Sequence, residues 1–168
     1  VQTSTTPANG IVVKVERTTP IDARLVDFQD ASIISEDDLD KSAIKNSKYL
    51  FIEGYLVASE ASLKACFEAI QVAREANTKI AISLSAAVIV DNFRDEINSL
   101  MESGCEILFC NESEACAFSQ HKDVLEAEKY LRDVASQNLI TLGKKGCVIW
   151  DGSKLKIIKG FKSKAIDT

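Results

Sequence analysis

Asn111 and Glu114 stand three residues apart, where a short apolar run gives way to an acidic segment that favours a helix. The unbroken run Ile107 to Phe109 predicts a strand covered on both faces, because a half-exposed strand would alternate apolar and polar residues. Parallel sheets bind ligands beyond the carboxyl ends of their strands, which is where Asn111 would lie. An amide and a carboxylate at this spacing also form a capping box, so a binding role and a helix cap both stay open.

A second polar stretch runs from Thr141 to Gly146 and again follows an apolar run. Gly143 and Gly146 can adopt positive φ, which is typical of a hairpin turn. Lys144 and Lys145 add local positive charge, or are simply solvated as turn lysines often are. The sequence has neither a G-x-x-x-x-G-K-[ST] P-loop nor a G-x-G-x-x-G fingerprint, so it lacks these two ways of binding nucleotide phosphates.

The elements that must position these residues alternate between strands and helices from Tyr49 onward. Apolar runs predict strands at 49–52, 79–84, 107–109 and 139–142. Apolar residues at helical spacing predict helices whose buried faces span 63–73, 89–101 and 124–135. This β-α-β order predicts an α/β fold in which a parallel sheet carries helices on both faces. Strands at 147–150 and 155–158 follow turns too short for crossover helices, one of them Asp151-Gly152, and predict antiparallel hairpin strands at the end.

Residues 1–48 precede this regular pattern. Short β-favouring runs at 11–15 and 23–28, separated by a Thr-Thr-Pro turn, predict paired strands. Ser35 with Asp38 predicts a short capped helical turn. We therefore treat 1–168 as a single domain, in which 1–48 supplies strands and a connection and 49–168 forms the β/α core.

The composition excludes several classes of protein. The 168 residues are 46% hydrophobic and 27% charged, which is typical of a globular domain with a core. A net charge of -5 without a run of Lys and Arg argues against binding nucleic acid. No apolar stretch reaches the ~20 residues that span a bilayer, so we expect a soluble protein without a membrane partner. The five cysteines include no C-x-x-C pair, which indicates reduced thiols and a cytoplasmic location.

Three segments, in this order on a β/α scaffold, resemble the ribokinase and PfkB family of small-molecule kinases, which includes adenosine kinases and fructokinases. Asn111 to Glu114 resembles the Asn-x-x-Glu motif of the family, and Thr141 to Gly146 resembles its Thr-x-Gly-x-x-Gly turn. The terminal Asp167-Thr168 resembles the start of its Asp-Thr-x-Gly-Ala-Gly-Asp signature. Glu53-Gly54-Tyr55 resembles adenosine-kinase-like members in particular. The resemblance implies a ribokinase-like fold, of which this chain would be the middle portion and therefore an incomplete fold.

The resemblance also implies an activity. A PfkB-type kinase transfers the γ-phosphoryl group of ATP to a primary hydroxyl of a sugar or nucleoside, here of the adenosine, ribose or fructose class. Glu114 and Asn111 would hold a hydrated Mg²⁺ through its waters, because this ion prefers oxygen ligands and keeps several waters. Thr141, Gly143 and Gly146 would bind ATP beside the ion. A capping role and a metal-water role are compatible in one geometry.

Further residues and partners follow from the same resemblance. Asp167 would bind a monovalent cation such as K⁺. The general-base aspartate of the Gly-Ala-Gly-Asp segment would lie beyond Thr168, so we expect the chain alone to be inactive. Residues 1–48 would lie near the lid, which in some members forms dimer contacts, so a homodimer is compatible with the sequence. The substrate stays open, with an adenosine-like nucleoside slightly favoured by Glu53-Gly54-Tyr55.

The chain departs from the family pattern at Leu84-Ser85-Ala86-Ala87, where many members carry Asp or Asn followed by Pro near the phosphates. Nearby Asp91 and Arg94 could compensate for this departure, but, three residues apart on a predicted helix, they are rather expected to face water or to pair with each other. The alternative to a kinase is a non-catalytic α/β binding or interaction domain, in which the two motifs serve only as a helix cap and a turn.

Overall fold

Six β-strands form one mixed sheet, and their order in space is the same as their order in the chain, β1-β2-β3-β4-β5-β6. The structure, a computed structural model, describes residues 34–161. Its strands are β1 (Tyr49–Glu53), β2 (Lys79–Ser83), β3 (Cys105–Asn111), β4 (Ala135–Thr141), β5 (Gly146–Trp150) and β6 (Leu155–Lys159). The paired strands predicted at 11–15 and 23–28 lie outside the described residues.

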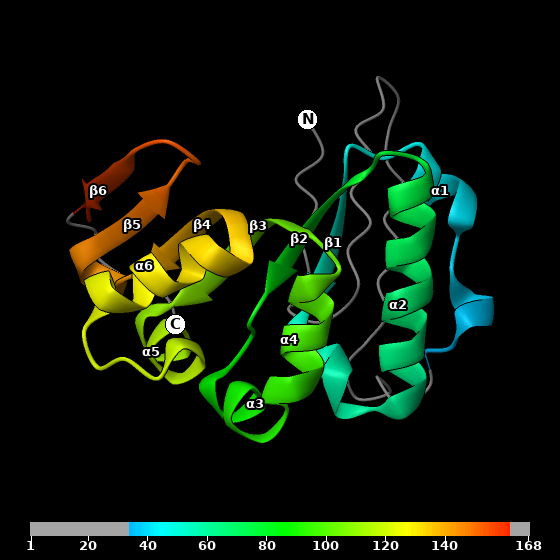
Figure 1. The fold of residues 1–168 in the computed structure, drawn as a ribbon, viewed down its shortest axis with the longest axis horizontal. Helices are drawn as coiled ribbons and strands as arrows, with labels where there is room; N and C mark the ends of the chain where they lie inside the picture. The colour runs from blue at the N-terminus through cyan, green and yellow to red at the C-terminus, as the bar shows by residue number, and fades with distance from the viewer. Residues whose placement is uncertain (1–33, 162–168) are drawn as a thin grey trace.

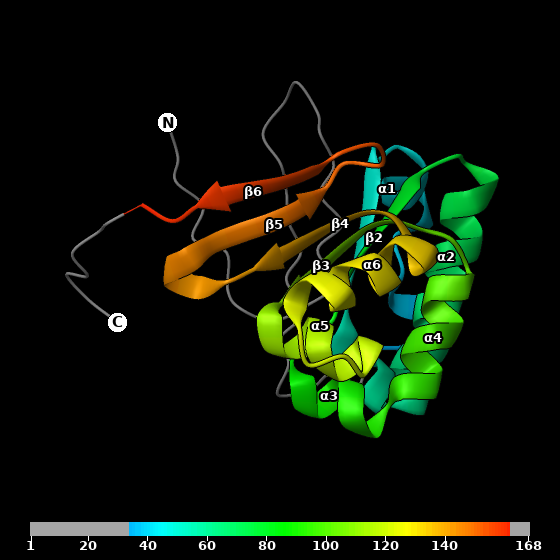
Figure 2. The ribbon, with the colours of Figure 1, turned by 60° about the vertical axis from the view of Figure 1, so that its left-hand side comes forward.

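β1 to β4 pair in parallel, and the pairs β4–β5 and β5–β6 are antiparallel, as the sequence predicts. The turn between β5 and β6 is the predicted Asp-Gly hairpin. The Asp151 carboxylate accepts hydrogen bonds from the backbone N–H groups of Ser153 (3.0 Å) and Lys154 (2.8 Å), and Gly152 adopts a φ of 90°. Figure 2 shows β4, β5 and β6 running side by side above the helices. β4 is the strand at which the pairing changes from parallel to antiparallel.

Within residues 34–161 the helices cover one face of this sheet, whereas the sequence pattern predicts helices on both faces, and they lie in front of the strands in Figure 1. Successive right-handed crossovers between adjacent parallel strands place their helices on the same side. The helices are α1 (Lys41–Lys45), α2 (Glu60–Glu75), α3 (Ala87–Asn92), α4 (Arg94–Glu102), α5 (Glu112–Ser119) and α6 (Val124–Val134), with short 3₁₀ turns η2 (Glu36–Asp38) and η3 (Gly54–Ala58). The face that they cover carries Ile52, Ile82 and Leu108, which are register partners in β1, β2 and β3 and are fully buried. None of the described helices has the length and apolar character needed to cross a membrane.

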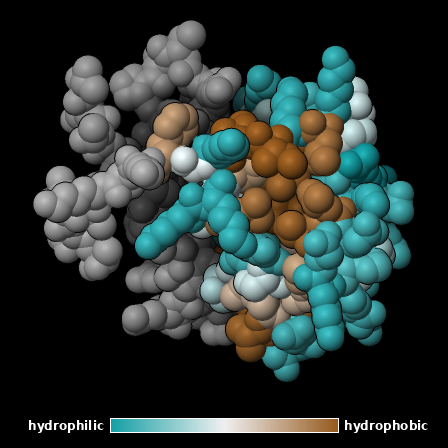
Figure 3. Space-filling view, turned by 90° about the vertical axis from the view of Figure 1, so that its left-hand side faces the viewer, coloured by the Kyte–Doolittle hydropathy of each residue, from teal (hydrophilic) through white to brown (hydrophobic). Residues whose placement is uncertain are grey.

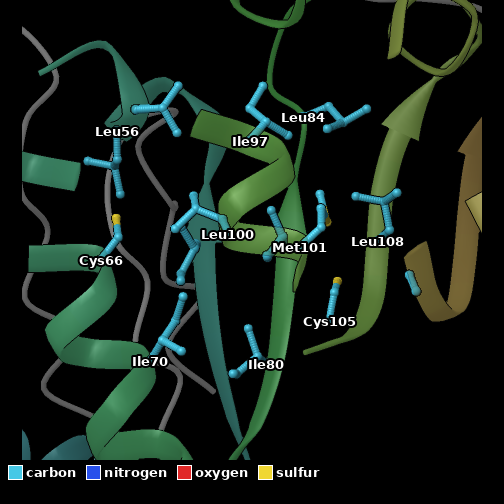
Figure 4. Packing of buried hydrophobic residues seen from close by; sticks show 14 of the residues in the cluster. Leu56, Cys66, Ile70, Ile80, Leu84, Ile97, Leu100, Met101, Cys105 and Leu108 are labelled. Carbon is cyan, nitrogen blue, oxygen red and sulfur yellow. The ribbon is translucent and has the colours of Figure 1, made fainter. Parts of the chain in front are cut away.

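The core lies between the helices α2 and α4 and the parallel strands. Figure 4 shows Cys66 and Ile70 of α2 and Leu100 of α4 pointing into this space, together with Ile80 of β2. Burying one such Leu or Ile side chain contributes about 1.5–3 kcal/mol, because its apolar surface leaves water. This shared core fixes the helices on the sheet and thereby the ends of the strands.

The predicted helix over 89–101 is divided into α3 and α4 at Phe93, whose backbone (φ -130°, ψ 36°) leaves the helical region. Periodicity does not reveal this break, because Val90 and Ile97 are seven residues apart and both are buried. Helical spacing of apolar residues therefore continues across a point where the helix itself stops.

The opposite face of the sheet is only partly buried. Ile107 and Phe109 of β3 are half-buried there, whereas Leu108 between them is fully buried by helices. The rings of Phe51 and Phe109 lie 5.9 Å apart on this face. Within residues 34–161, the apolar run of β3 thus reflects one face covered by helices and one face lined by aromatic and aliphatic side chains.

β6 forms one edge of the described sheet. All five of its residues are exposed, Ile157 to the extent of 63%. Figure 3 shows hydrophobic side chains gathered on the side of the molecule where β5 and β6 lie. Lys156 and Lys159 lie on the same strand, and charges of this kind discourage an edge strand from pairing with other chains.

Candidate functional site

Asn111 ends β3 and caps the N-terminus of α5. Its side-chain oxygen accepts hydrogen bonds from the backbone N–H of Glu114 (2.9 Å) and the hydroxyl of Ser113 (2.6 Å). Glu114 in return accepts two bonds, one from the backbone N–H of Asn111 (2.9 Å) and one from the Asn111 side-chain amide (2.5 Å). The predicted capping box is confirmed, with one additional bond between the two side chains.

These bonds give the two side chains different capacities. Both lone pairs of Asn111 Oδ1 are occupied, so its amide has no acceptor left for the hydrogen of a metal-bound water. Each carboxylate oxygen of Glu114 accepts one bond and keeps a further acceptor position. Because Mg²⁺ prefers carboxylate oxygens and retains waters, this donor set fits a hydrated Mg²⁺. Glu114 would face the waters of the ion, and Asn111 would orient Glu114.

Glu114 is only 5% exposed, which is unusual for a carboxylate. Burial raises the pKa of the Glu114 carboxyl, the backbone N–H of Asn111 opposes this rise, and the Glu53 carboxylate adds to it. Among residues 34–161, neither of these two carboxylates takes part in an ion pair. A cation bound at Glu114 would relieve this repulsion between like charges.

Glu53 ends β1 and is fixed from two sides. The hydroxyl of Ser85 donates a hydrogen bond to Glu53 Oε2 (2.7 Å), and Ser85 has a positive φ of 65°. A residue with a Cβ loses about 1–2 kcal/mol in this left-handed region, so the surrounding loop must stabilise it. Gly54 lies against the same loop, since a Cβ at this position would come within 2.8 Å of the carbonyl oxygens of Ser83 and Leu84. This close approach joins the ends of β1 and β2.

The two predicted motifs meet at one edge of the sheet. Asn111 and Thr141 are register partners at the last positions of β3 and β4. Neighbouring strands lie roughly 4.8 Å apart, so the Asn111–Glu114 pair is next to the turn that follows Thr141. An ion pair between Glu112 of α5 and Lys145 of η4 (Gly143–Lys145), 3.3 Å long, also links the helix to the turn.

The two glycines of this turn have different surroundings. Gly143 has a φ of 56°, and a Cβ added there would find no atom within 4 Å. Gly146 has a φ of 110°, and its Cβ would lie 1.9 Å from the carbonyl oxygen of Ile158. Packing against β6 therefore explains Gly146, whereas Gly143 leaves one side of the turn open to a ligand.

Sequence reasoning did not find every residue at this edge. A positive φ at Ser85 has no compositional or periodic signal. Glu53 is indicated by its place after a predicted strand and by the resemblance of Glu53-Gly54-Tyr55, but neither signal predicts its bond to Ser85. The expectation that Arg94 faces water or pairs with Asp91 is wrong, because Arg94 is half-buried and bonds to the end of α5. Asp167 lies outside the described residues.

Comparisons with known proteins agree with this geometry. The family model of pfkB family carbohydrate kinases matches residues 4–168. The adenosine kinase of Sinorhizobium meliloti is 26% identical, with a TM-score of 0.76 over 81% of this chain and 42% of that one. A probable sugar kinase from Rhizobium etli CFN 42 is 24% identical, with a TM-score of 0.74 over 78% and 40%. A putative ribokinase II from E. coli, solved in complex with ATP and Mg²⁺, is 17% identical, with a TM-score of 0.69 over 79% and 44%.

These matches confirm the predicted ribokinase-like α/β fold. A comparison with curated proteins found no match. The chain spans about two fifths of the length of the solved structures described above, as expected for part of the family's fold. Because the family model extends over nearly all of its residues, the chain belongs to the pfkB family of carbohydrate kinases.

Proposed function

We propose that this chain supplies the nucleotide and Mg²⁺ side of an ATP-dependent kinase that phosphorylates a primary hydroxyl of a sugar or nucleoside. The observation that carries the proposal is the pairing of Asn111 with Thr141, which places Glu114 beside the Gly143 turn. Membership in the pfkB family supports the reaction class, and a structural neighbour was solved with ATP and Mg²⁺.

Each residue has a defined task in this proposal. Glu114 accepts hydrogen bonds from the waters of the ion, and Asn111 holds its carboxylate in place. Mg²⁺ bound there would neutralise charge on the phosphate oxygens during transfer. The hydroxyl of Thr141 and the open backbone at Gly143 bind the nucleotide, and Gly146 keeps the turn against β6.

We further propose the class of acceptor and the remaining parts of the site. An adenosine-like nucleoside is favoured over ribose or fructose, because Glu53-Gly54-Tyr55 resembles adenosine-kinase-like members and an adenosine kinase shares 26% identity. Asp167 binds a monovalent cation such as K⁺. We propose that the general base is the aspartate of a Gly-Ala-Gly-Asp segment, which residues 1–168 do not contain, and that these residues alone are inactive. We also propose that the protein is located in the cytoplasm and forms a homodimer.

The test uses the complete protein that carries these residues. Calorimetric titration with ATP is run with Mg²⁺ and again with excess chelator, and phosphoryl transfer is followed with adenosine, ribose and fructose as acceptors. We expect tight binding only when Mg²⁺ is present, and turnover with one class of acceptor. A folded protein that binds no Mg·ATP and phosphorylates none of the three would contradict the proposal.

A non-catalytic α/β binding or interaction domain is the second candidate. It is favoured by one observation, that the capping box accounts for the Asn111 and Glu114 side chains without any ligand. In that case Glu114→Gln would change the stability of the protein, and the unsubstituted protein would not bind Mg·ATP. The same titration therefore separates the two candidates.

A further inference from the structure

The helix that carries Glu114 is too short to be stable by itself. α5 has eight residues, and isolated helices shorter than ~12 residues are marginal in water. Its N-terminus is fixed to β3 by the bonds between Asn111 and Glu114. Along its length α5 packs against α3 and α6, and Phe118 in its last turn is buried beside Tyr130 of α6. Bonds to its C-terminus add a directional hold to this packing.

Arg94 makes that second attachment. Its Nη1 donates a hydrogen bond to the carbonyl oxygen of Phe118 (2.5 Å), and its Nη2 donates one to the carbonyl oxygen of Ala117 (2.8 Å). These carbonyls belong to the last turn of α5, where backbone oxygens lack partners within the helix and carry partial negative charge. Among residues 34–161, no carboxylate forms an ion pair with Arg94, so both of these donors serve α5.

The break between α3 and α4 puts Arg94 in reach of α5. Arg94 is the first residue of α4, directly after Phe93, and α3 on the other side of the break packs against α5. The loop before α3 contains Ser85, which bonds to Glu53, and Leu84, whose N–H donates to the carbonyl of Phe109 (3.0 Å). Arg94 therefore connects the end of α5 to the segment that begins at the ends of β1 and β2.

We propose that Arg94 is a positioning residue for the Mg²⁺ side of the site, because it holds the last carbonyls of α5 and thereby fixes the helix on which Glu114 is carried. This inference rests on the proposed function, which gives Glu114 its task at the ion. The guanidinium makes both bonds at once through its planar fork, whereas a lysine ammonium keeps the charge without that geometry. Arg94 acts on metal binding through Glu114, and binding of the acceptor does not depend on it.

The experiment compares Arg94→Met and Arg94→Lys in the complete protein, at a temperature well below the unfolding midpoint of each variant. Mn²⁺ serves as the metal probe, and its free concentration is read from its electron paramagnetic resonance signal without substrate. We expect Arg94→Met to weaken Mn²⁺ binding about tenfold, the effect typical of residues that orient a metal ligand. Arg94→Lys is expected to fall between this variant and the parent.

Turnover gives a second readout. The Mg²⁺ concentration for half-maximal activity is expected to rise by the same factor in Arg94→Met, while the KM for the acceptor stays within about twofold. Arg74→Met is the matched control, because Arg74 is exposed in the last turn of α2, at the edge where β2 begins, and we expect no change.

The outcomes separate this inference from the function on which it rests. If the parent protein binds Mn²⁺ and transfers phosphoryl groups but Arg94→Met binds Mn²⁺ equally well, the role of Arg94 is overturned alone. Equal loss of metal and acceptor binding would indicate general loosening and overturn it too. A folded parent protein that neither binds Mn²⁺ nor transfers phosphoryl groups would remove the proposed function and the role of Arg94 with it.

Discussion

Asn111 and Thr141 stand at the same level of the sheet, as the last residues of two neighbouring parallel strands. This register brings an oriented carboxylate beside a glycine turn that is open on one side. A shift of one residue would turn one of the two side chains to the opposite face of the sheet. The site therefore depends on the exact pairing of β3 with β4.

Glu114 and Glu112 form a matched pair of carboxylates at the start of α5. We expect Glu114→Gln to weaken Mg²⁺ binding by about tenfold or more, because an amide carries less negative charge and brings an N–H towards the donors of Asn111. Glu112→Gln removes only an exposed ion pair with Lys145 and is expected to change little. Calorimetry of Mg·ATP binding measures both variants. Equal effects of the two substitutions would exclude a special role for Glu114.

Substitution of the two turn glycines by alanine is expected to have different effects at Gly143 and at Gly146. Gly146→Ala places a Cβ 1.9 Å from the carbonyl oxygen of Ile158, so β6 must move and the free energy of unfolding must fall sharply. Gly143→Ala meets no neighbouring atom and adds only the strain of a positive φ, about 1–2 kcal/mol. We expect this variant to stay folded and to lose affinity for Mg·ATP. Urea unfolding and nucleotide titration distinguish the two variants. An unchanged affinity of Gly143→Ala for Mg·ATP would show that the nucleotide does not bind at this turn.

The pKa of Glu114 predicts how metal binding depends on pH. The raised pKa lets Glu114 hold a proton above the usual carboxyl value of 4.5, and this proton competes with Mg²⁺. Metal binding is therefore expected to weaken as the pH falls through the raised pKa. Glu53→Gln removes the like charge that contributes to the shift, so the loss of binding moves to lower pH.

The stability of the metal-free protein tests the direction of the Glu114 pKa shift in a second way. Because folding raises the pKa, the protonated form of Glu114 stabilises the fold below the unfolded pKa, and this contribution disappears as the pH rises through the folded pKa. Thermal unfolding in chelator from about pH 4 to 8 is expected to show a smaller decline in Glu53→Gln than in the parent. Glu102→Gln, at the far end of α4, is the control. A decline that is unchanged in Glu53→Gln would show that the two carboxylates do not interact.

The cysteines are expected to react in two groups. Burial raises the pKa of Cys66 and of Cys105 to about 12 and also raises that of Cys110, so these thiols are neither accessible nor ionised near neutral pH. Cys116 and Cys147 are partly exposed. Titration of the native protein with a thiol reagent is expected to modify the last two residues first and the other three only after unfolding. Early modification of Cys66 would contradict the packing of α2 on the sheet.

The sequence predicts those features that depend on neighbours in the chain. The strand ending at Asn111, the box with Glu114 and the hairpin at Asp151-Gly152 each follow from residues within a few positions of one another. The meeting of Asn111 with Thr141 is also predictable, because consecutive β-α-β units place the carboxyl ends of parallel strands along one edge.

The remaining features depend on contacts between distant segments. The partners of Arg94 lie in a helix more than twenty residues away, and charge spacing along its own helix points instead to Asp91. The backbone of Ser85 is set by the approach of the loop to Glu53 and has no local signature. The need for Gly146 comes from the close approach of β6 across the hairpin, a backbone distance that the hairpin pattern itself does not give.

Gly54 restricts how this site can change during evolution. Any side chain there would collide with two carbonyl oxygens at the end of β2, so the position cannot vary unless the loop moves as well. Its neighbours Glu53 and Tyr55 already carry side chains at the same strand end. Variation at this strand end is therefore expected at the residues on either side of a glycine that itself must stay.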